Sequence, residues 1–145
     1  MSDSMQRVKQ EFHDLLLQNG AEIGACDLSK ECAVGNDVFN VSGLGYVVVL
    51  ASTENPGSWE FEESFVKALI DLSQDQNIWY VFLIVRQDGR GANGYIVSEF
   101  NQKPVKKPFE AVDGIYTIKE KRNFDSLRLL LSTDKIVNIL LRNKN

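Results

Sequence analysis

The sequence predicts an α/β fold, with α+β as the alternative class, built on one mixed central β-sheet. Residues 46–52 and 78–85 form two unbroken apolar runs of strand length, and the segment between them has the spacing of one amphipathic helix. Strands that are apolar at every position are buried on both faces, so we expect helices on each side of the sheet. Two such strands joined by a helix are most simply a parallel pair, which makes the unit a β-α-β crossover.

Length and composition predict one globular domain over residues 1–145. A chain of this length buries about 70% of the surface that it exposes when unfolded, so it needs no disulfide or structural metal. No apolar run approaches the ~18 residues of a membrane span, and the polar N-terminus does not resemble a signal peptide. We therefore expect a cytoplasmic protein without a membrane partner.

The first element is a helix over residues 5–18, capped by Ser4 and ended by Gly20. Its apolar stripe consists of Val8, Phe12, Leu15 and Leu16. His13 lies beside this stripe, so we interpret it as a boundary residue rather than a catalytic base.

Turn-type clusters divide the next part of the chain into a meander of short strands. The candidate strands are residues 21–26, 31–34, 38–41 and 45–52. Pro56 and Gly57 then stop the extended chain and open a second helix, with Glu60, Glu62 and Glu63 in its first turn, where carboxylates complement the helix dipole. The apolar residues Phe61, Phe65, Ala68, Leu69 and Leu72 have helical spacing and are expected to dock on the sheet.

After the second apolar run, residues 87–93 form a polar turn and residues 95–100 return as an antiparallel neighbour. A short strand over residues 114–119 follows. Asn123 and Thr133 are the predicted caps of two last helices, over residues 124–131 and 134–142. Counted with three of the four candidate strands between the first two helices, the predicted order is α-β-β-β-α-β-β-β-α-α.

A glycine motif of the form G-x-G-x-x-G occupies residues 89–94. In a dinucleotide-binding fold this motif leaves a strand and opens a helix that holds the pyrophosphate. Here Tyr95, Ile96 and Val97 follow, and these are strand formers. We interpret the motif as a hairpin turn and predict no nucleotide cofactor.

Metal-ligating side chains are sparse in the sequence. Cys26 and Cys32 are the only cysteines and His13 is the only histidine, so a zinc site lacks its ligands and the cysteines are interpreted as a reduced pair. We predict no metal and no other cofactor.

The predicted order of helix, strands, helix and strand resembles the core of nucleases of the restriction-endonuclease type. In that family an Asp and a Glu-x-Lys on adjacent strands hold a divalent metal, which prepares a water for attack on phosphate. Asp37, at the start of one strand, matches the first ligand, but residues 47–52 of the next strand contain neither an acid nor a lysine. The resemblance therefore implies a relative that is inactive or weakly active as a nuclease.

Charge is distributed unevenly along the chain. Residues 1–77 carry 4 basic and 13 acidic side chains, whereas residues 78–145 carry 12 basic and 7 acidic ones. The candidate binding cations are Arg86, Arg90, Lys103, Lys106, Lys107, Lys119, Lys121 and Arg122, and the candidate acidic patch is Glu60, Glu62 and Glu63. The cations either engage phosphates or an acidic partner, or they form a solvated face that pairs with the acidic half of the protein. The pI of about 5.0 favours the second interpretation.

These observations favour a non-catalytic accessory or regulatory protein that binds another macromolecule, most simply another protein. The alternative is a nucleic-acid-binding protein of restriction-endonuclease-like architecture. An enzyme built from scattered Asp, Lys and Tyr residues is the third interpretation. Opposite charges on one chain also favour head-to-tail or twofold self-association, and a homodimer is one such assembly.

Overall fold

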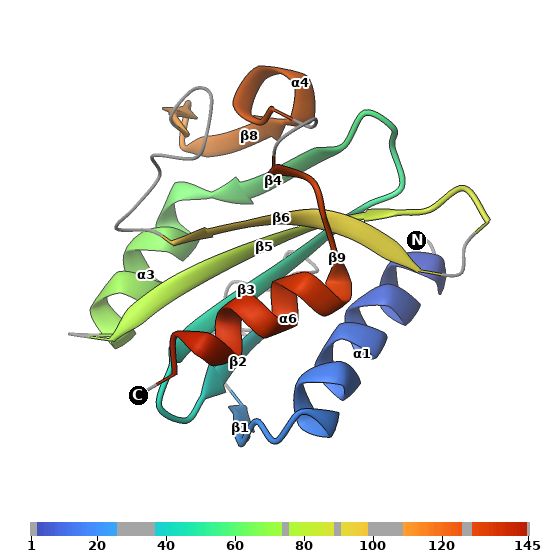
Figure 1. Ribbon diagram of the computed structural model, residues 1–145. Coiled ribbons are helices and arrows are strands. Elements are labelled where there is room, and N and C mark those ends of the chain that lie inside the picture. The colour runs from blue at the N-terminus through green and yellow to red at the C-terminus, as the bar shows by residue number, and fades with distance from the viewer. Residues whose placement is uncertain are drawn as a thin grey trace.

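The computed structural model describes residues 3–25, 37–73, 76–88, 91–98, 109–125 and 129–144. These residues form a mixed α/β fold, as predicted, with a six-stranded mixed sheet, a second sheet of three strands and four helices (Figure 1). The elements are α1 Asp3–Gln18, β1 Ile23–Ala25, β2 Asp37–Val41, β3 Gly45–Ser52, β4 Ser58–Glu62, α3 Glu63–Ser73, β5 Asn77–Val85, β6 Ala92–Ser98, β7 Ala111–Val112, β8 Ile115–Lys119, α4 Glu120–Asn123, β9 Leu131–Ser132 and α6 Thr133–Arg142.

The large sheet has the strand order β1-β2-β3-β5-β6-β9. The two apolar runs, β3 and β5, are parallel neighbours at its centre, which confirms the predicted crossover. The other neighbouring strands described in this sheet are antiparallel. Residues 89 and 90 of the glycine motif lie outside the described residues. The antiparallel pairing of Val85 with Ala92 shows that β5 and β6 form a hairpin, as predicted.

Both faces of the large sheet are buried, as the apolar runs predict. Val47, Val49, Val81 and Leu83 face α1 and α6, and each has no exposed surface. Val48, Leu50, Tyr80 and Phe82 point to the opposite face. That opposite face is covered by α3 and the small sheet, so helices lie on both faces, but strands cover part of the second face as well (Figure 1).

The second predicted helix begins later than expected. Residues 58–62 form strand β4, and α3 starts at Glu63, so the prediction that Glu60 and Glu62 lie in a helical first turn is wrong. The physical reason is an alternation of period two: Trp59 and Phe61 are 3% and 4% exposed, whereas Glu60 and Glu62 are exposed to solvent. Only Glu63 remains at the helix start.

The predicted strand 114–119 exists as β8, but it does not extend the large sheet. It pairs with β4 and β7 in the small sheet, in the order β4-β8-β7. Asp113 and Gly114 have positive φ angles of 53° and 78° and form a two-residue turn between Val112 and Ile115. An Asp-Gly pair is a strong hairpin signal, because both residues tolerate this backbone conformation.

The last part of the chain differs from the prediction in two ways. Phe124 is not helical: it follows the short helix α4 and its ring stacks on Tyr95 in the core, with centroids 4.1 Å apart. Leu131 begins strand β9, so the predicted helix 124–131 is wrong at both ends. The final helix is confirmed, but its cap is Ser132, whose hydroxyl accepts a hydrogen bond from the Lys135 amide at 3.3 Å, rather than Thr133.

Helix α1 and strands β1, β2, β3, β5 and β6 agree with prediction to within a few residues. The predicted cap of the first helix is wrong, because α1 begins at Asp3 and Ser4 therefore lies within it. The predicted strand 31–34, together with Cys26 and Cys32, lies outside the described residues. In the parts of the chain that the structure describes, no helix is long and apolar enough to cross a membrane. The cytoplasmic location stays a prediction.

Candidate functional site

The pairing of β4 with β8 and β7 creates a small sheet with one buried and one exposed face. Trp59, Phe61 and Ile118 point into the core, where Phe61 stacks on Tyr116 at 5.1 Å. Side chains directly opposite in an antiparallel pair lie on the same face. The other face, here called the outward face, therefore carries Ser58, Glu60, Glu62, Val112, Ile115, Thr117 and Lys119.

Basic side chains occupy the end of the outward face next to α4. The Lys119 ammonium donates a hydrogen bond to the Ser58 hydroxyl at 2.7 Å. Arg122 reaches back from α4 and donates to the main-chain oxygen of Thr117. The buried Asn123 side chain accepts from the Lys119 amide at 3.0 Å and from Arg122 Nε at 3.4 Å. Two of the predicted cations are thus held in fixed positions, and exposed Lys121 lies between them in sequence.

Acidic side chains occupy the middle of the same face. Glu60 lies opposite Thr117 and Glu62 opposite Ile115, so both carboxylates share the face with Lys119. Glu63 is separate: it lies in the first turn of α3 and forms an ion pair with Lys67 at 3.8 Å. The predicted acidic patch is therefore divided between a strand face and a helix start.

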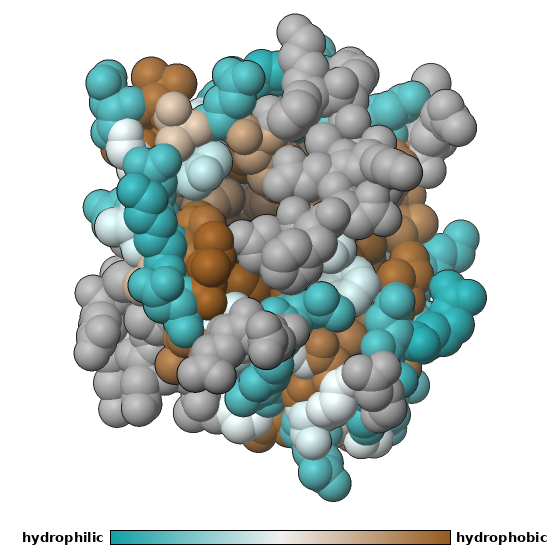
Figure 2. All heavy atoms as spheres, turned by 90° about the vertical axis from the view of Figure 1, so that its left-hand side faces the viewer, coloured by the Kyte–Doolittle hydropathy of each residue, from teal (hydrophilic) through white to brown (hydrophobic). Residues whose placement is uncertain are grey.

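Apolar side chains mark the far end of the outward face. Val112 is 69% exposed and Ile115 is 40% exposed, although both lie within strands. Figure 2 shows the side of the molecule on which α3 and the β7–β8 turn lie, and hydrophobic side chains are open to view there between hydrophilic ones. Sequence reasoning did not identify these two residues, although the Asp113-Gly114 turn signal between them was present.

A buried carboxylate fixes the small sheet to the large one. Glu120, at the start of α4, is only 7% exposed; its Oε1 accepts from the Gly57 amide at 2.8 Å, and its Oε2 accepts from the Tyr95 hydroxyl of β6. The Glu120 amide also donates to the Gly57 oxygen at 2.9 Å. Burial, and after it the hydrogen bond to Glu120, raises the pKa of Tyr95, so its phenol stays protonated and serves as a donor rather than a base.

Of the remaining predicted cations, the structure describes Arg86 alone, and it does not lie on the outward face. Arg86 lies at the carboxyl end of the central strand β5, and its guanidinium lies 3.5 Å from the Asp88 carboxylate. Arg90, Lys103, Lys106 and Lys107 lie outside the described residues. The structure thus places Lys119, Lys121 and Arg122 on β8 and α4, and Arg86 directly after β5.

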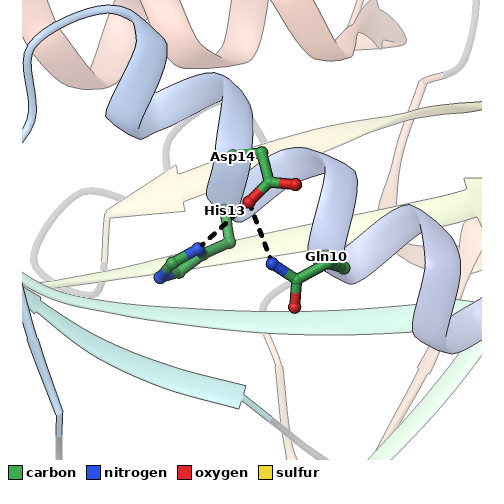
Figure 3. Close-up of polar contacts among 3 residues, drawn as sticks. All are labelled: Gln10, His13 and Asp14. Atoms are coloured by element: carbon green, nitrogen blue, oxygen red, sulfur yellow. Dashed lines mark hydrogen bonds and ion pairs between the residues drawn. The ribbon is translucent and has the colours of Figure 1, made fainter.

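His13 is a half-buried residue of α1 (Figure 3). Its ring packs against Phe39 of β2 with centroids 4.8 Å apart, and its Nδ1 lies 3.7 Å from Asp14 Oδ1. Gln10 donates to the same carboxylate oxygen at 2.9 Å (Figure 3). This placement confirms the interpretation of His13 as a boundary residue.

Asp37, the candidate metal ligand, is the first residue of β2 and lies opposite Val49 of β3. The described part of the chain contains no group of three or more His, Cys, Asp or Glu residues that could hold a metal ion. No family model, no curated protein and no solved structure matches the chain.

Proposed function

We propose that the protein is a non-catalytic binding protein that recognises another protein through the outward face of the β4-β8-β7 sheet. One observation carries the proposal: this face combines Lys119, Glu60 and Glu62 with the exposed apolar residues Val112 and Ile115. Protein interfaces combine apolar and charged side chains, and here the exposed apolar end of the face adjoins its charged residues, whereas an isolated exposed Val or Ile needs no explanation.

The same face argues for a protein partner over a nucleic acid. A nucleic-acid surface neutralises phosphates with Lys and Arg, and its affinity comes mainly from these contacts. Glu60 and Glu62 share this face with Lys119 and would repel a phosphate backbone. A protein partner with charges of both signs is not subject to this repulsion.

The proposal is tested by capturing partners from a lysate of the native host on the immobilised protein and on three variants. The double variant Val112→Asp/Ile115→Asp removes the apolar end of the face, and Glu60→Lys/Glu62→Lys reverses its acidic middle. Ile70→Asp is the matched control, because Ile70 is 44% exposed but lies on α3.

We expect one or more proteins to be retained by the wild type and by Ile70→Asp and lost from both double variants. Interface residues of this kind contribute about 1–2 kcal/mol each, so a double variant weakens binding at least about tenfold. Equal retention by all four proteins contradicts the proposal. Wild-type binding to a 30-base-pair DNA duplex at ~50 mM salt, with an affinity that falls steeply as salt rises, supports the nucleic-acid alternative instead.

A further inference from the structure

A cavity lies at the carboxyl ends of the two parallel strands. Its volume is about 450 Å³, and it is lined by Asn55, which follows β3, by residues 84–88 at the end of β5, and by Asn93, Glu120 and Leu130. In open α/β sheets ligands bind outside the carboxyl ends of the parallel strands, because the chain departs there in different directions. None of the residues that line the cavity lies on the outward face, so the cavity is a separate site from the proposed interface.

Glu120 gives this cavity a buried charged group. Its carboxylate accepts two hydrogen bonds, one on each oxygen, from the Gly57 amide and the Tyr95 hydroxyl. An ionised carboxylate has about four acceptor positions, so each oxygen retains capacity for a further donor. The two donors fix the orientation of the carboxylate without neutralising it.

The charges around the cavity favour a cation. Arg86 is the one cation among the described lining residues, and it pairs with Asp88 at 3.5 Å. Glu120 forms no ion pair within the described residues. A buried carboxylate that has only neutral donors is costly, and a cationic group beside it recovers part of that cost.

We propose that this cavity binds an alkylammonium or guanidinium group, with Glu120 as its counter-ion. The side-chain oxygens of Asn55 and Asn93 supply further acceptors, and Ile84 and Leu130 contact the alkyl part of the ligand. The group comes either from a free amine or from a Lys or Arg side chain of another protein, since both present the same chemistry.

The proposal is tested by NMR titration of the full chain, following the backbone amides of Gly57, Arg86 and Asn93. The probe is n-butylammonium, and butyrate is the matched control because it has the same alkyl length and the opposite charge. We expect saturable shifts of these amides with n-butylammonium and none with butyrate. Agmatine, N-acetyl-lysine N-methylamide and N-acetyl-arginine N-methylamide form the other arms: tighter binding of the amino-acid amides indicates a protein side chain, and tighter binding of agmatine or n-butylammonium indicates a free amine.

Variants locate the site. Glu120→Gln retains an acceptor but removes the charge, and we expect at least a tenfold loss of n-butylammonium affinity. Glu22→Gln is the matched control, because Glu22 is exposed and lies outside both the cavity and the outward face, and it should leave the affinity within twofold of the wild type. If Glu120→Gln does not fold, Leu130→Trp fills the cavity without altering the Glu120 contacts, and the same loss is expected. Equal binding of butyrate, or unchanged affinity in Glu120→Gln or Leu130→Trp, overturns the proposal.

Discussion

The indole nitrogen of Trp59 donates a hydrogen bond to the main-chain oxygen of Leu83 at 3.1 Å, which joins β4 of the small sheet to β5 at the centre of the large sheet. The Trp59 ring also makes edge contacts with Phe82, Tyr95 and Phe124. Trp59 therefore links the outward face to the most buried part of the molecule.

Replacing Trp59 by Phe removes this hydrogen bond while an aromatic ring remains. We expect the free energy of unfolding to fall by about 2–4 kcal/mol, from the lost bond together with the lost ring volume. Urea denaturation measures the change. Trp79→Phe is the matched control: its indole nitrogen is buried and makes no hydrogen bond within the described residues, so the loss there should be smaller. Equal losses contradict a role for the Trp59 bond.

The Tyr95 hydroxyl makes the free energy of unfolding depend on pH in the alkaline range. Its pKa in the folded protein is raised above the ordinary value of 10.0. Above pH 10 the unfolded chain therefore loses a proton that the folded protein retains, and stability falls as the pH rises, by about 1.4 kcal/mol per pH unit from this group. Tyr95→Phe should be less stable than the wild type at pH 7 but show a weaker decline between pH 10 and 11. Denaturant unfolding at several pH values checks both, and parallel curves for the two proteins exclude the assignment.

Gly94 allows β6 to lie close to β5. A side-chain carbon at this position would overlap the main-chain oxygen of Phe82. We expect Gly94→Ala to destabilise the protein by about 2–3 kcal/mol, because the overlap is with backbone that cannot move without disturbing the central strands. Gly24→Ala is the control, since its nearest contact is Asn40 O at 3.8 Å and the change there should stay below about 1 kcal/mol. Thermal unfolding distinguishes the two.

The N-terminus of α6 is capped by Ser132. Ser132→Ala should lower the free energy of unfolding by about 1 kcal/mol, because the Lys135 amide loses its acceptor. Thr133→Ala is the comparison, since the sequence pattern alone names Thr133 as the cap. A larger loss from Thr133→Ala in denaturant unfolding would reverse the assignment.

Self-association is expected through charges of both signs on the outward face. A twofold arrangement brings Glu60 and Glu62 of one copy towards Lys119 and Lys121 of the other, and this attraction weakens as salt screens it. Light scattering coupled to size exclusion should show a dimer at ~50 mM salt and more monomer at ~1 M salt. Glu60→Lys/Glu62→Lys should be monomeric at both salt concentrations, and a wild-type monomer under both conditions rules the dimer out.

Much of the fold could be predicted because long apolar runs leave few alternatives. Local sequence patterns predict the parallel pairing of β3 and β5, the helix α1 and the β5–β6 hairpin. Each of these patterns is contained in a few consecutive residues, either as an apolar run or spacing or as a group of turn residues. Strand β4 could not be predicted in the same way, because glutamates after Pro56 and Gly57 also fit a helix start. Buried and exposed residues alternate from Ser58 to Glu62, which is typical of a strand, but the apolar residues of this segment also fit the spacing of a helix.

The sequence by itself determined the two apolar strands, the crossover between them and the separation of acidic and basic segments. Only the tertiary structure decided that Glu60 and Glu62 share a face with Lys119, because that pairing joins strands more than fifty residues apart and depends on the core packing of Trp59 and Phe61. The position of Glu120 beside Gly57 and Tyr95 was likewise set by distant contacts. A local sequence pattern indicates which side chains are buried. The neighbours of each surface residue depend instead on how distant segments of the chain pack together around the core.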